Sequence, residues 1–571
     1  IPRHLVVEVT ERIDREGRII RPLDEAEAQA AIARLAAQEV AAVAICTLWS
    51  TANPVHERRL GALVQAAMPG VFVTLGHEIS PSVGEYGRMS TAAANAALGP
   101  VAGGYLARLE QALQAAGMRV PVLMMTNAGG VLPTEVLSDR PVYALFSGPA
   151  AGVIGSGAIG DLLGQENLLT TDIGGTSFDV GVIVRRRPVM RREISVAGAD
   201  LRVPSIDVAS IGAGGGSIAA VRFGALTVGP QSAGSRPGPA CYGRGGVEPT
   251  ATDADLVLGV LDPENFIGGA MRLDVEAARR AIHDRVAVPL GIGLMEAAWG
   301  IRGVLDGKMA ALLRRATIER GHDPREFLLL ANGGAGPSHA WALVRDLWMD
   351  RFLVPAAATA QSAFGCANSR LGLTRESAVY LRASTGTAPP EAALAAVDAE
   401  LGRLAAETAG LLRAAGAEGE VRVERFLAIR YRGQTNTVDV AVGEGRFDQP
   451  AFAAAAAAFE AEYETQFGRG ATFTAAGFEV MGARVTATGT LTPPRLLAAG
   501  EGLQRAGARP ILFDLAAGPV ETAIWRTSFP PPGAVVEGPA IIEFPGQSVV
   551  VPPGGHAEAD AIGNLHVRIG A

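Results

Sequence analysis

The chain has 571 residues, too many for a single ordinary domain, and 48% of them are hydrophobic, which is enough for several large cores. Its net charge of −8 argues against a nucleic-acid-binding protein, and no apolar run reaches the roughly 18–20 residues that a membrane-spanning helix needs. The three cysteines are far apart in the sequence and provide neither a disulfide framework nor a metal site. We therefore expect a cytoplasmic protein that binds neither nucleic acid nor membrane.

Strand and helix patterns alternate over the first hundred residues. Apolar runs on both sides of residues 14–16 predict a hairpin, and Asp24 begins a helix in which Glu27 completes a capping box. An apolar strand near 40–49 and a helix over 53–68 follow, and a second apolar strand comes after that helix. This order predicts an α/β fold with a parallel or mixed sheet.

A helix over residues 91–118 comes next, and a second helical segment near 145–164 is unusually rich in small residues. Its Gly152, Gly155 and Gly160 each cost about 1 kcal/mol of helix stability relative to alanine. We therefore expect another backbone to pass very close to this helix. Ordinary tight packing is the alternative.

The second half of the chain changes character once. Residues 168–260 read mostly as strands and glycine loops, and residues 275–320 read as helices. An apolar strand then leads through a glycine turn at 332–336 into another helix. Near residue 375 this pattern ends, and an Ala-rich helix pair near 389–415 precedes a β-rich tail of short strands and Pro/Gly turns. We place a domain boundary there.

The segment TTDIGGTSFDVGVI, residues 170–183, places two carboxylates around a glycine pair between two predicted strands. Gly174 and Gly175 permit backbone angles that other residues disfavour, and successive amides at such a turn can form an anion-binding concavity. Asp172 and Asp179 would repel a phosphate unless a cation intervened, so they imply Mg²⁺. The turn is either a phosphate cradle or a β-hairpin with a polar turn. Because the only lysine lies outside any P-loop pattern, a Walker-type site is excluded.

Two further glycine turns are candidate binding elements. The segment NGGAGP at 332–337 lies between a strand and a helix, and its glycines let the chain approach a flat ligand such as adenosine; a tight strand-to-helix turn explains it equally well. The segment IGAGGGSIA at 211–219 has apolar flanks, which disfavours a flexible loop. The three turns occur in the order expected of the sugar kinase, heat-shock protein 70 and actin superfamily, in which two lobes of related fold close on ATP.

The whole set of motifs resembles the hydantoinase A/oxoprolinase family, which includes the ATP-binding subunits of N-methylhydantoinase and of acetone and acetophenone carboxylases. The resemblance runs over essentially the whole chain and is carried by the segments SGPAAGV, DIGGTSFDV, GAGGGSIA, SAGSRPGPACYGRGG, PTATDADLVLG, ERGHDPREF, GGAGPSHA, YRGQT and GPAIIEFPGQSVVVPPG. It implies an α/β fold of two actin-like ATPase lobes plus a C-terminal β-rich domain. We expect the remainder of the first lobe in 1–145, the second lobe in 146–375 and the C-terminal α+β, β-rich domain in 376–571.

The resemblance also implies a function. The chain would be the ATP-binding subunit of a two-component ATP-dependent hydrolase that opens a cyclic amide after phosphorylating its carbonyl oxygen. Its partner would be a hydantoinase B-type subunit, and its substrate a small neutral amide or ketone. An ATP-dependent ketone carboxylase subunit, a small-molecule kinase and an actin-like nucleotide switch are alternatives.

The same resemblance assigns the site residues by motif. Asp172 and Asp179 would be catalytic and would bind Mg²⁺. The ATP-binding residues would be Gly174, Gly175, Thr176, Ser177, Gly214, Gly215, Gly216, Ser217, Gly333, Gly334 and Gly336. Asp253 and Asp255 are further cleft candidates, with a turn and a helix cap as the alternative, and His339 is expected to cap its helix.

The sequence departs from the family pattern at its start. The family's N-terminal lobe begins with a DxGGTxTD hairpin, and this sequence contains no such motif. We therefore expect the chain to lack the family's N-terminal segment, or the site to be half-built.

Overall fold

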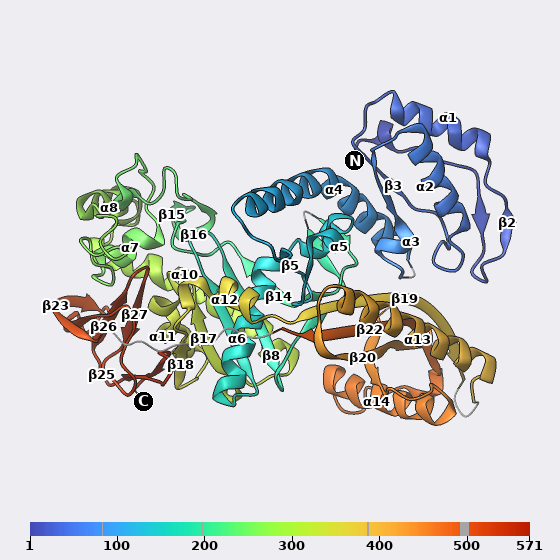
Figure 1. The fold of residues 1–571 in the computed structure, drawn as a ribbon. Coiled ribbons are helices and arrows are strands. Elements are labelled where there is room, and N and C mark those ends of the chain that lie inside the picture. The colour runs from blue at the N-terminus through green and yellow to red at the C-terminus, as the bar shows by residue number, and fades with distance from the viewer. Residues whose placement is uncertain (83, 197, 385–387, 435, 492–501, 571) are drawn as a thin grey trace. The chain divides into compact units, whose positions relative to one another are not determined.

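The computed structural model describes residues 1–570 except 83, 197, 385–387, 435 and 492–501 (Figure 1). The chain divides into two compact units with interleaved ranges. Unit 1 comprises residues 1–150, 190–206 and 369–492, and unit 2 comprises residues 151–189, 207–368 and 493–571. The predicted division into three contiguous parts stays a prediction, although strand β19 (Leu371–Ala383) runs straight through the boundary placed at 375.

The first part of unit 1 has the predicted alternation of strands and helices. Strands β1 (Arg12–Ile13) and β2 (Ile19–Arg21) form the expected antiparallel hairpin. Helix α1 (Glu25–Ala36) begins as predicted, with the Asp24 side chain accepting from the Glu27 amide, but the capping box is not formed because the Glu27 carboxylate accepts from the Thr10 amide instead. Strands β3 (Ala42–Ile45) and β4 (Phe72–Leu75) are parallel, and helix α2 (Val55–Ala67) connects them.

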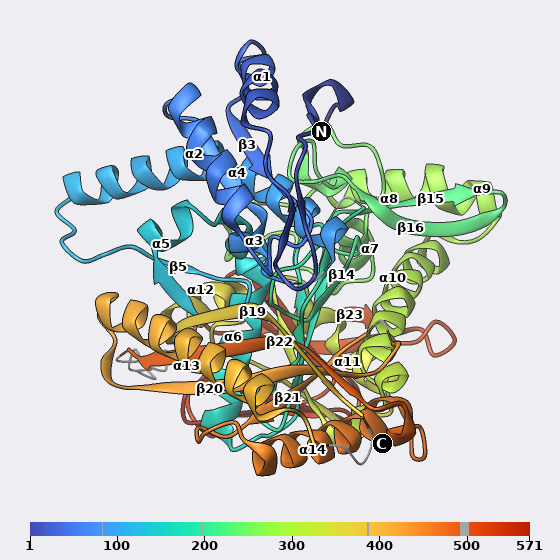
Figure 2. The same ribbon diagram turned by 90° about the vertical axis from the view of Figure 1, so that its right-hand side faces the viewer.

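A six-stranded sheet forms the second part of unit 1, in the order β21-β20-β22-β19-β6-β5. The other strands are β5 (Leu123–Met125), β6 (Val131–Pro133), β20 (Glu418–Tyr431), β21 (Val438–Val442) and β22 (Phe478–Thr490). Helix α13 (Glu391–Ala414) packs on β19 and β22 (Figure 2). The predicted helix pair near 389–415 is therefore one helix. The remaining helices of this unit are α3 (Gly76–Ile79), α4 (Glu85–Ala115), α5 (Thr134–Ser138) and α14 (Gln449–Phe467).

Unit 2 is built on a nine-stranded sheet in the order β14-β8-β7-β17-β18-β29-β28-β25, with β9 paired to β8. Strands β7, β17 and β18 are parallel to one another, whereas β8 is antiparallel to β7 and β29 is antiparallel to β18. The bounds are β7 (Leu168–Ile173), β8 (Phe178–Val184), β9 (Arg187–Pro188), β14 (Val208–Ile211), β17 (Leu328–Asn332), β18 (Arg351–Val354), β25 (Val535–Glu537), β28 (His556–Ala559) and β29 (Leu565–Arg568).

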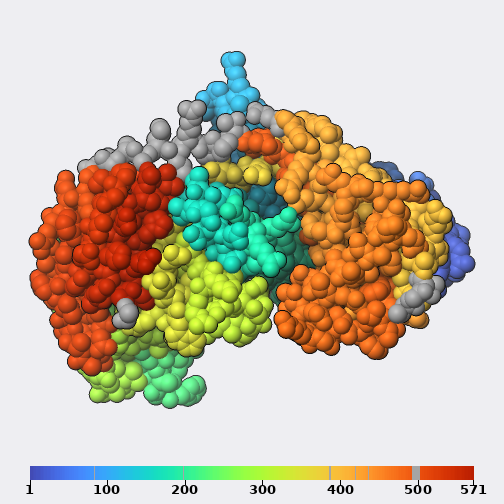
Figure 3. Space-filling view, turned by 90° about the horizontal axis from the view of Figure 1, so that it is seen from below, coloured from blue at the N-terminus to red at the C-terminus, as the bar shows by residue number. Residues whose placement is uncertain are grey.

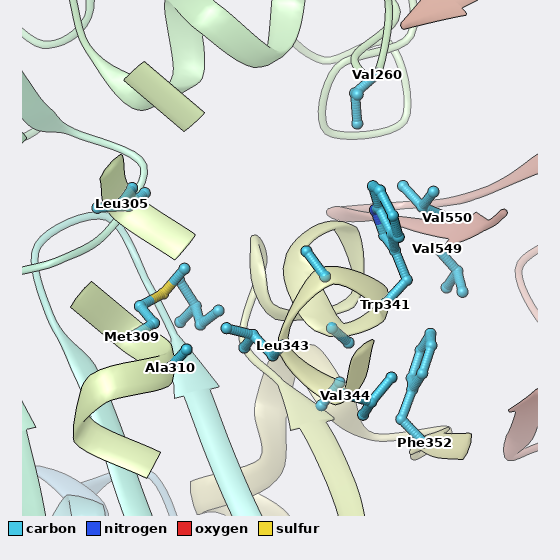
Figure 4. Close-up of a cluster of buried hydrophobic side chains, with 14 of the residues drawn as sticks. Val260, Leu305, Met309, Ala310, Trp341, Leu343, Val344, Phe352, Val549 and Val550 are labelled. Carbon is cyan, nitrogen blue, oxygen red and sulfur yellow. The ribbon is translucent and has the colours of Figure 1, made fainter. Parts of the chain in front are cut away.

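Helices and a second sheet cover this core. The hydrophobic cluster around helices α10 and α11 includes Leu305, Met309, Trp341 and Val550, and all four side chains are buried (Figure 4). The C-terminal part of the chain, red in the space-filling view (Figure 3), contributes β25, β28 and β29 to the nine-stranded sheet and also forms a separate four-stranded sheet in the order β23-β24-β26-β27. The bounds are α7 (Ala251–Val257), α8 (Val275–Ile282), α10 (Leu294–Ala316), α11 (Gly336–Asp346), α12 (Gln361–Asn368), β15 (Ser217–Arg222), β16 (Ala225–Ser232), β23 (Gln504–Leu512), β24 (Pro519–Arg526), β26 (Ala540–Phe544) and β27 (Gln547–Val551).

The small-residue helix is α6 (Ser147–Leu163), and a second backbone does pass close to it. An added Cβ at Gly155 would lie 2.9 Å from the carbonyl oxygen of Gln361 and 3.0 Å from the amide nitrogen of Gly365, both in α12. The predicted close approach is therefore confirmed, and glycine is needed on both helices. Within the described ranges, no single helix is long and apolar enough to cross a membrane; the segments Val275–Leu290 and Leu294–Arg320 meet that test only as a bent pair.

Candidate functional site

The turn between β7 and β8 lies where three neighbouring strands of unit 2 meet. Asp172 on β7 is directly opposite Asp179 on β8, and the parallel strand β17 places Asn332 beside Asp172. Directly paired residues on neighbouring strands point their side chains to the same face of a sheet. Two carboxylates and one carboxamide therefore share one face, and the first and second predicted glycine motifs meet there.

The glycines of this turn leave room rather than supply unusual backbone angles. Neither Gly174 nor Gly175 has a positive φ, and an added Cβ at either position would meet no atom within 4 Å. The left-handed angles that these glycines permit are therefore not used, and what the glycines leave is open space. Across the described residues, the amides of Gly175 and Thr176 have no hydrogen-bond partner, so both can donate to an anion.

The loop at 212–217 holds this turn through backbone hydrogen bonds. The amide of Gly215 donates to the carbonyl oxygen of Gly174 at 3.0 Å, and the amide of Gly216 donates to that of Gly175 at 2.7 Å. The buried hydroxyl of Ser217 accepts from the Gly214 amide at 2.9 Å. The structure therefore brings this predicted motif to the first turn, but the amides of Gly215 and Gly216 are occupied by the protein itself.

The turn between β17 and α11 borders the same aspartate. Gly333 has a φ of +83°, and its added Cβ would overlap Oδ1 of Asp172 and the carbonyl oxygen of Ile173. This position therefore requires glycine for both its angle and its space. Gly334 is exposed and borders a narrow pocket, and Gly336 is the first residue of α11. Other residues that line the pocket are Asn265, Phe266, Ile267, Phe544 and Gln547.

The aspartate pair has the electrostatics of a cation site. Burial and the charge of Asp179 raise the pKa of Asp172 to about 6. Two carboxylates held together repel each other, and a divalent cation removes that repulsion. No group of three or more His, Cys, Asp or Glu side chains in the described part of the chain could hold a metal ion. The pair nevertheless fits Mg²⁺, which commonly takes one or two carboxylates and completes its shell with phosphate oxygens and water.

A buried ion network under the start of α11 was not found from the sequence. The guanidinium of Arg302 donates to Asp255 and to the carbonyl oxygen of Ser338, and the imidazole of His339 lies 2.6 Å from Asp306 and 3.4 Å from Asp255. Burial lowers the pKa of His339, but the charges of Asp306 and Asp255 outweigh it and raise that pKa to about 9. A positive His339 thus links α11 to α7 and α10 and does not cap its helix. Arg302 and Asp306, opposite charges four residues apart on α10, are the sequence signal.

The second TDAD aspartate enters that network, whereas the first has a capping role. Asp253 forms a capping box with Thr250 at the start of α7 and accepts from the amides of Ala240 and Cys241 at 3.2 and 2.7 Å. The turn-and-cap alternative therefore describes Asp253. Burial, together with Asp253, raises the pKa of the Cys241 thiol, so this cysteine stays protonated.

Comparison with known proteins shows that the chain belongs to a family. The hydantoinase/oxoprolinase model matches residues 88–375, the model of that family's N-terminal region matches residues 1–68, and the model of its C-terminal domain matches residues 391–569. The expectation that the chain lacks the family's N-terminal segment is therefore wrong, because residues 1–68 match the model of that region; the sequence nevertheless does not contain the DxGGTxTD motif.

Individual relatives match nearly the whole chain. The caprolactamase subunit alpha of Pseudomonas jessenii is 36% identical over 568 residues, which cover 98% of this chain and 81% of the relative. The acetone carboxylase beta subunit of Xanthobacter autotrophicus is 29% identical over 590 residues, which cover 100% and 81%. The crystal structure of the ATP-dependent caprolactamase from P. jessenii aligns with a TM-score of 0.89 at 35% identity and covers 100% of this chain and 83% of that one. The predicted α/β fold is confirmed by this alignment.

Proposed function

Since the chain belongs to the hydantoinase/oxoprolinase family, we propose that it is the nucleotide-binding subunit of an ATP-dependent enzyme that opens a cyclic amide. The relatives are subunits of ATP-dependent enzymes for a lactam and for a ketone. Over nearly the whole chain, identity is 36% to the caprolactamase subunit and 29% to the acetone carboxylase subunit, and this whole-chain comparison favours the amide. The acetophenone carboxylase gamma subunit of Aromatoleum aromaticum is 38% identical, but over only 61% of the chain. A ketone carboxylase is the second candidate, because it shares the phosphorylated intermediate.

One observation carries this proposal: two facing carboxylates lie beside a turn in which the amides of Gly175 and Thr176 have no partner among the described residues. In our proposal the amides of Gly175 and Thr176 bind phosphate oxygens, and Asp172 and Asp179 hold Mg²⁺, which neutralises charge on the phosphates. Ser177 belongs to the same turn. The loop from Gly214 to Ser217 holds this turn in place, and the second turn, which contains Gly333, Gly334 and Gly336 and is exposed at Gly334, receives the adenosine.

The proposed phosphorylation step follows from the low reactivity of an amide toward water. Its nitrogen is a poor leaving group and its carbonyl carbon is a weak electrophile. Transfer of the γ-phosphoryl group to the carbonyl oxygen forms an oxygen–phosphorus bond and releases ADP, and the carbon then becomes open to attack by water. The carbon–nitrogen bond breaks as the nitrogen takes up a proton and leaves as an amine, and the acyl phosphate that remains loses phosphate by cleavage of its carbon–oxygen bond as water supplies the second carboxylate oxygen. The chain's part is to bind and orient the phosphates, because phosphoryl transfer is promoted chiefly by positioning and electrostatics.

Isotope transfer tests the proposal on the complete enzyme. With ¹⁸O in the substrate carbonyl, the label should appear in released phosphate, because the labelled oxygen becomes bonded to phosphorus before its bond to carbon breaks. The Asp172→Ala variant should release labelled phosphate at least a hundredfold more slowly, as is typical when a key electrostatic group is lost. Unlabelled phosphate, released at the same rate with and without substrate, would contradict the mechanism and favour a nucleotide switch.

The partner and the location belong to the same proposal. The relatives are named as subunits, and we propose that a hydantoinase B-type protein supplies the remainder of the active site for a small neutral substrate. We also propose that the enzyme acts in the cytoplasm, where ATP is abundant.

A further inference from the structure

Asn332 is the last residue of β17, and it has an unused hydrogen-bonding atom in a buried place. The residue is 1% exposed, and its Oδ1 has no hydrogen-bond partner among the described residues. Leaving such an acceptor unpaired costs about 1–3 kcal/mol. A buried orphan of this kind requires an explanation, and a bound ion or ligand is one.

The position of Asn332 indicates which kind of ligand its Oδ1 binds. It pairs with Asp172 across β17 and β7, and Asp172 pairs with Asp179 across β7 and β8, so the three side chains form a row on one face of the sheet. Gly333 has no side chain, and a Cβ there would overlap Oδ1 of Asp172. The Asp172 carboxylate therefore lies against the residue that follows Asn332.

The carboxamide is also held in one orientation. Its Nδ2 donates to Oγ1 of Thr170 at 3.3 Å, and that hydroxyl is 2.9 Å from Oγ of Ser156 on α6. Ser156 in turn donates to the carbonyl oxygen of Gly152. Because Nδ2 is engaged in this chain of hydrogen bonds, Oδ1 is the end of the carboxamide that remains available. Partners of this kind orient the first ligands of metal sites.

We propose that Oδ1 of Asn332 is the third protein oxygen ligand of the divalent cation held by Asp172 and Asp179. The inference rests on the proposed function, which places the cation there. An amide oxygen suits a hard cation and adds a ligand without adding a third repelling charge. It also accounts for an orphan acceptor beside two carboxylates that cannot donate to it while ionised.

Three variants of the 571-residue chain test the proposal through metal binding, with Mn²⁺ as the probe and electron paramagnetic resonance as the readout. Asn332→Leu removes the oxygen and should weaken Mn²⁺ binding in the presence of ADP by about tenfold or more. Asn332→Asp keeps the size, supplies a charged oxygen and should bind Mn²⁺ several-fold more tightly. Asn368→Leu is the control, because the Asn368 amide donates only within its own helix, and it should leave binding unchanged.

The outcomes separate this inference from the proposed function. A fluorescent ADP analogue, titrated in EDTA, should bind wild type and Asn332→Leu alike, because the amide turns are intact in both. Mn²⁺ binding that is equal in Asn332→Leu and wild type would overturn the inference, and so would an Asn332→Asp variant that binds Mn²⁺ less tightly than wild type. Should Asn332→Leu fail to fold, the isosteric aspartate variant decides alone. A wild-type chain that binds neither Mn²⁺ nor ADP would overturn the proposed function and this inference with it.

Discussion

Glycine has two different roles at the candidate site. At Gly174 an added Cβ would meet no atom within 4 Å, whereas at Gly214 it would lie 2.7 Å from the carbonyl oxygen of Gly174. The sequence pattern singled out both glycines as candidate ATP-binding residues. It could not distinguish open space from backbone contact, because that contact joins residues forty positions apart. Asn332 was missed for a similar reason, since its meaning depends on the strand beside it.

Substitution of these two glycines provides a matched pair. Gly214→Ala should destabilise unit 2 by about 1–3 kcal/mol, the range for overpacking, because the new methyl group overlaps the turn that it supports. It should also weaken binding of a fluorescent ADP analogue. Gly174→Ala should leave the thermal midpoint within error of wild type, because the added methyl group meets open space. Equal midpoints for the two variants would show that the loop yields without cost.

At the level of elements, the sequence predicted most helices and strands but not all of their limits. The close approach at α6 was predictable because small residues in a helix are costly unless another backbone needs the room. The pair of helices near 389–415 was not predicted correctly, because α13 continues through Gly402 and Gly410 without a break. The capping box failed because Glu27 is drawn to the Thr10 amide, a tertiary contact that local pattern does not contain.

The start of α11 is held by a protonated histidine, and this gives a pH prediction. The folded-state pKa of His339 is about 9, above its ordinary value of 6.5, so its stabilising contribution is complete below about 6.5 and is lost as the pH rises through about 9. The charged groups around it are Asp255, Arg302 and Asp306. His339→Gln should therefore unfold at a lower temperature than wild type at pH 6.5. The difference between the two unfolding temperatures is the margin of interest, and it should become smaller toward pH 9.

Thermal unfolding at several pH values measures this margin. His4→Gln is the control, because His4 is exposed, and its margin should be near zero throughout. A margin for His339→Gln that stays constant from pH 6.5 to 9 would show that the imidazole contributes by packing and not by charge.

At the scale of the whole molecule, neighbours in space are often distant in sequence. β17 lies between β7 and β18, although more than 140 residues separate it from β7 in the sequence. The chain also passes from one compact unit to the other several times. The glycine motifs and their order made the fold class predictable, because each motif requires a particular strand and turn. The interleaving was not predictable, because hydrophobic periodicity shows that a strand exists and not which strand it joins.

A partner subunit is the prediction that belongs to this scale. Relatives of the chain are named as subunits, and purification of the tagged chain from its native host should yield a second, hydantoinase B-type protein in near-equal amount, as measured by quantitative mass spectrometry. Washing at high salt tests whether the association is specific. Recovery of the chain alone, or only of its homo-oligomer, would argue against the two-component enzyme.

The last strand of the chain has a consequence for biosynthesis. β29 is hydrogen-bonded between β18 and β28 in the sheet that carries the turn at 174–177, and it ends at Arg568. During translation, one edge of β18 therefore stays unpaired until the long segment between β18 and β29 has been synthesised. An unpaired strand edge is prone to wrong pairing, and slow assembly of distant segments prolongs that exposure. The nascent chain should accordingly be prone to wrong pairing at β18 until β29 has been synthesised, and the sheet that carries the turn at 174–177 is completed only then.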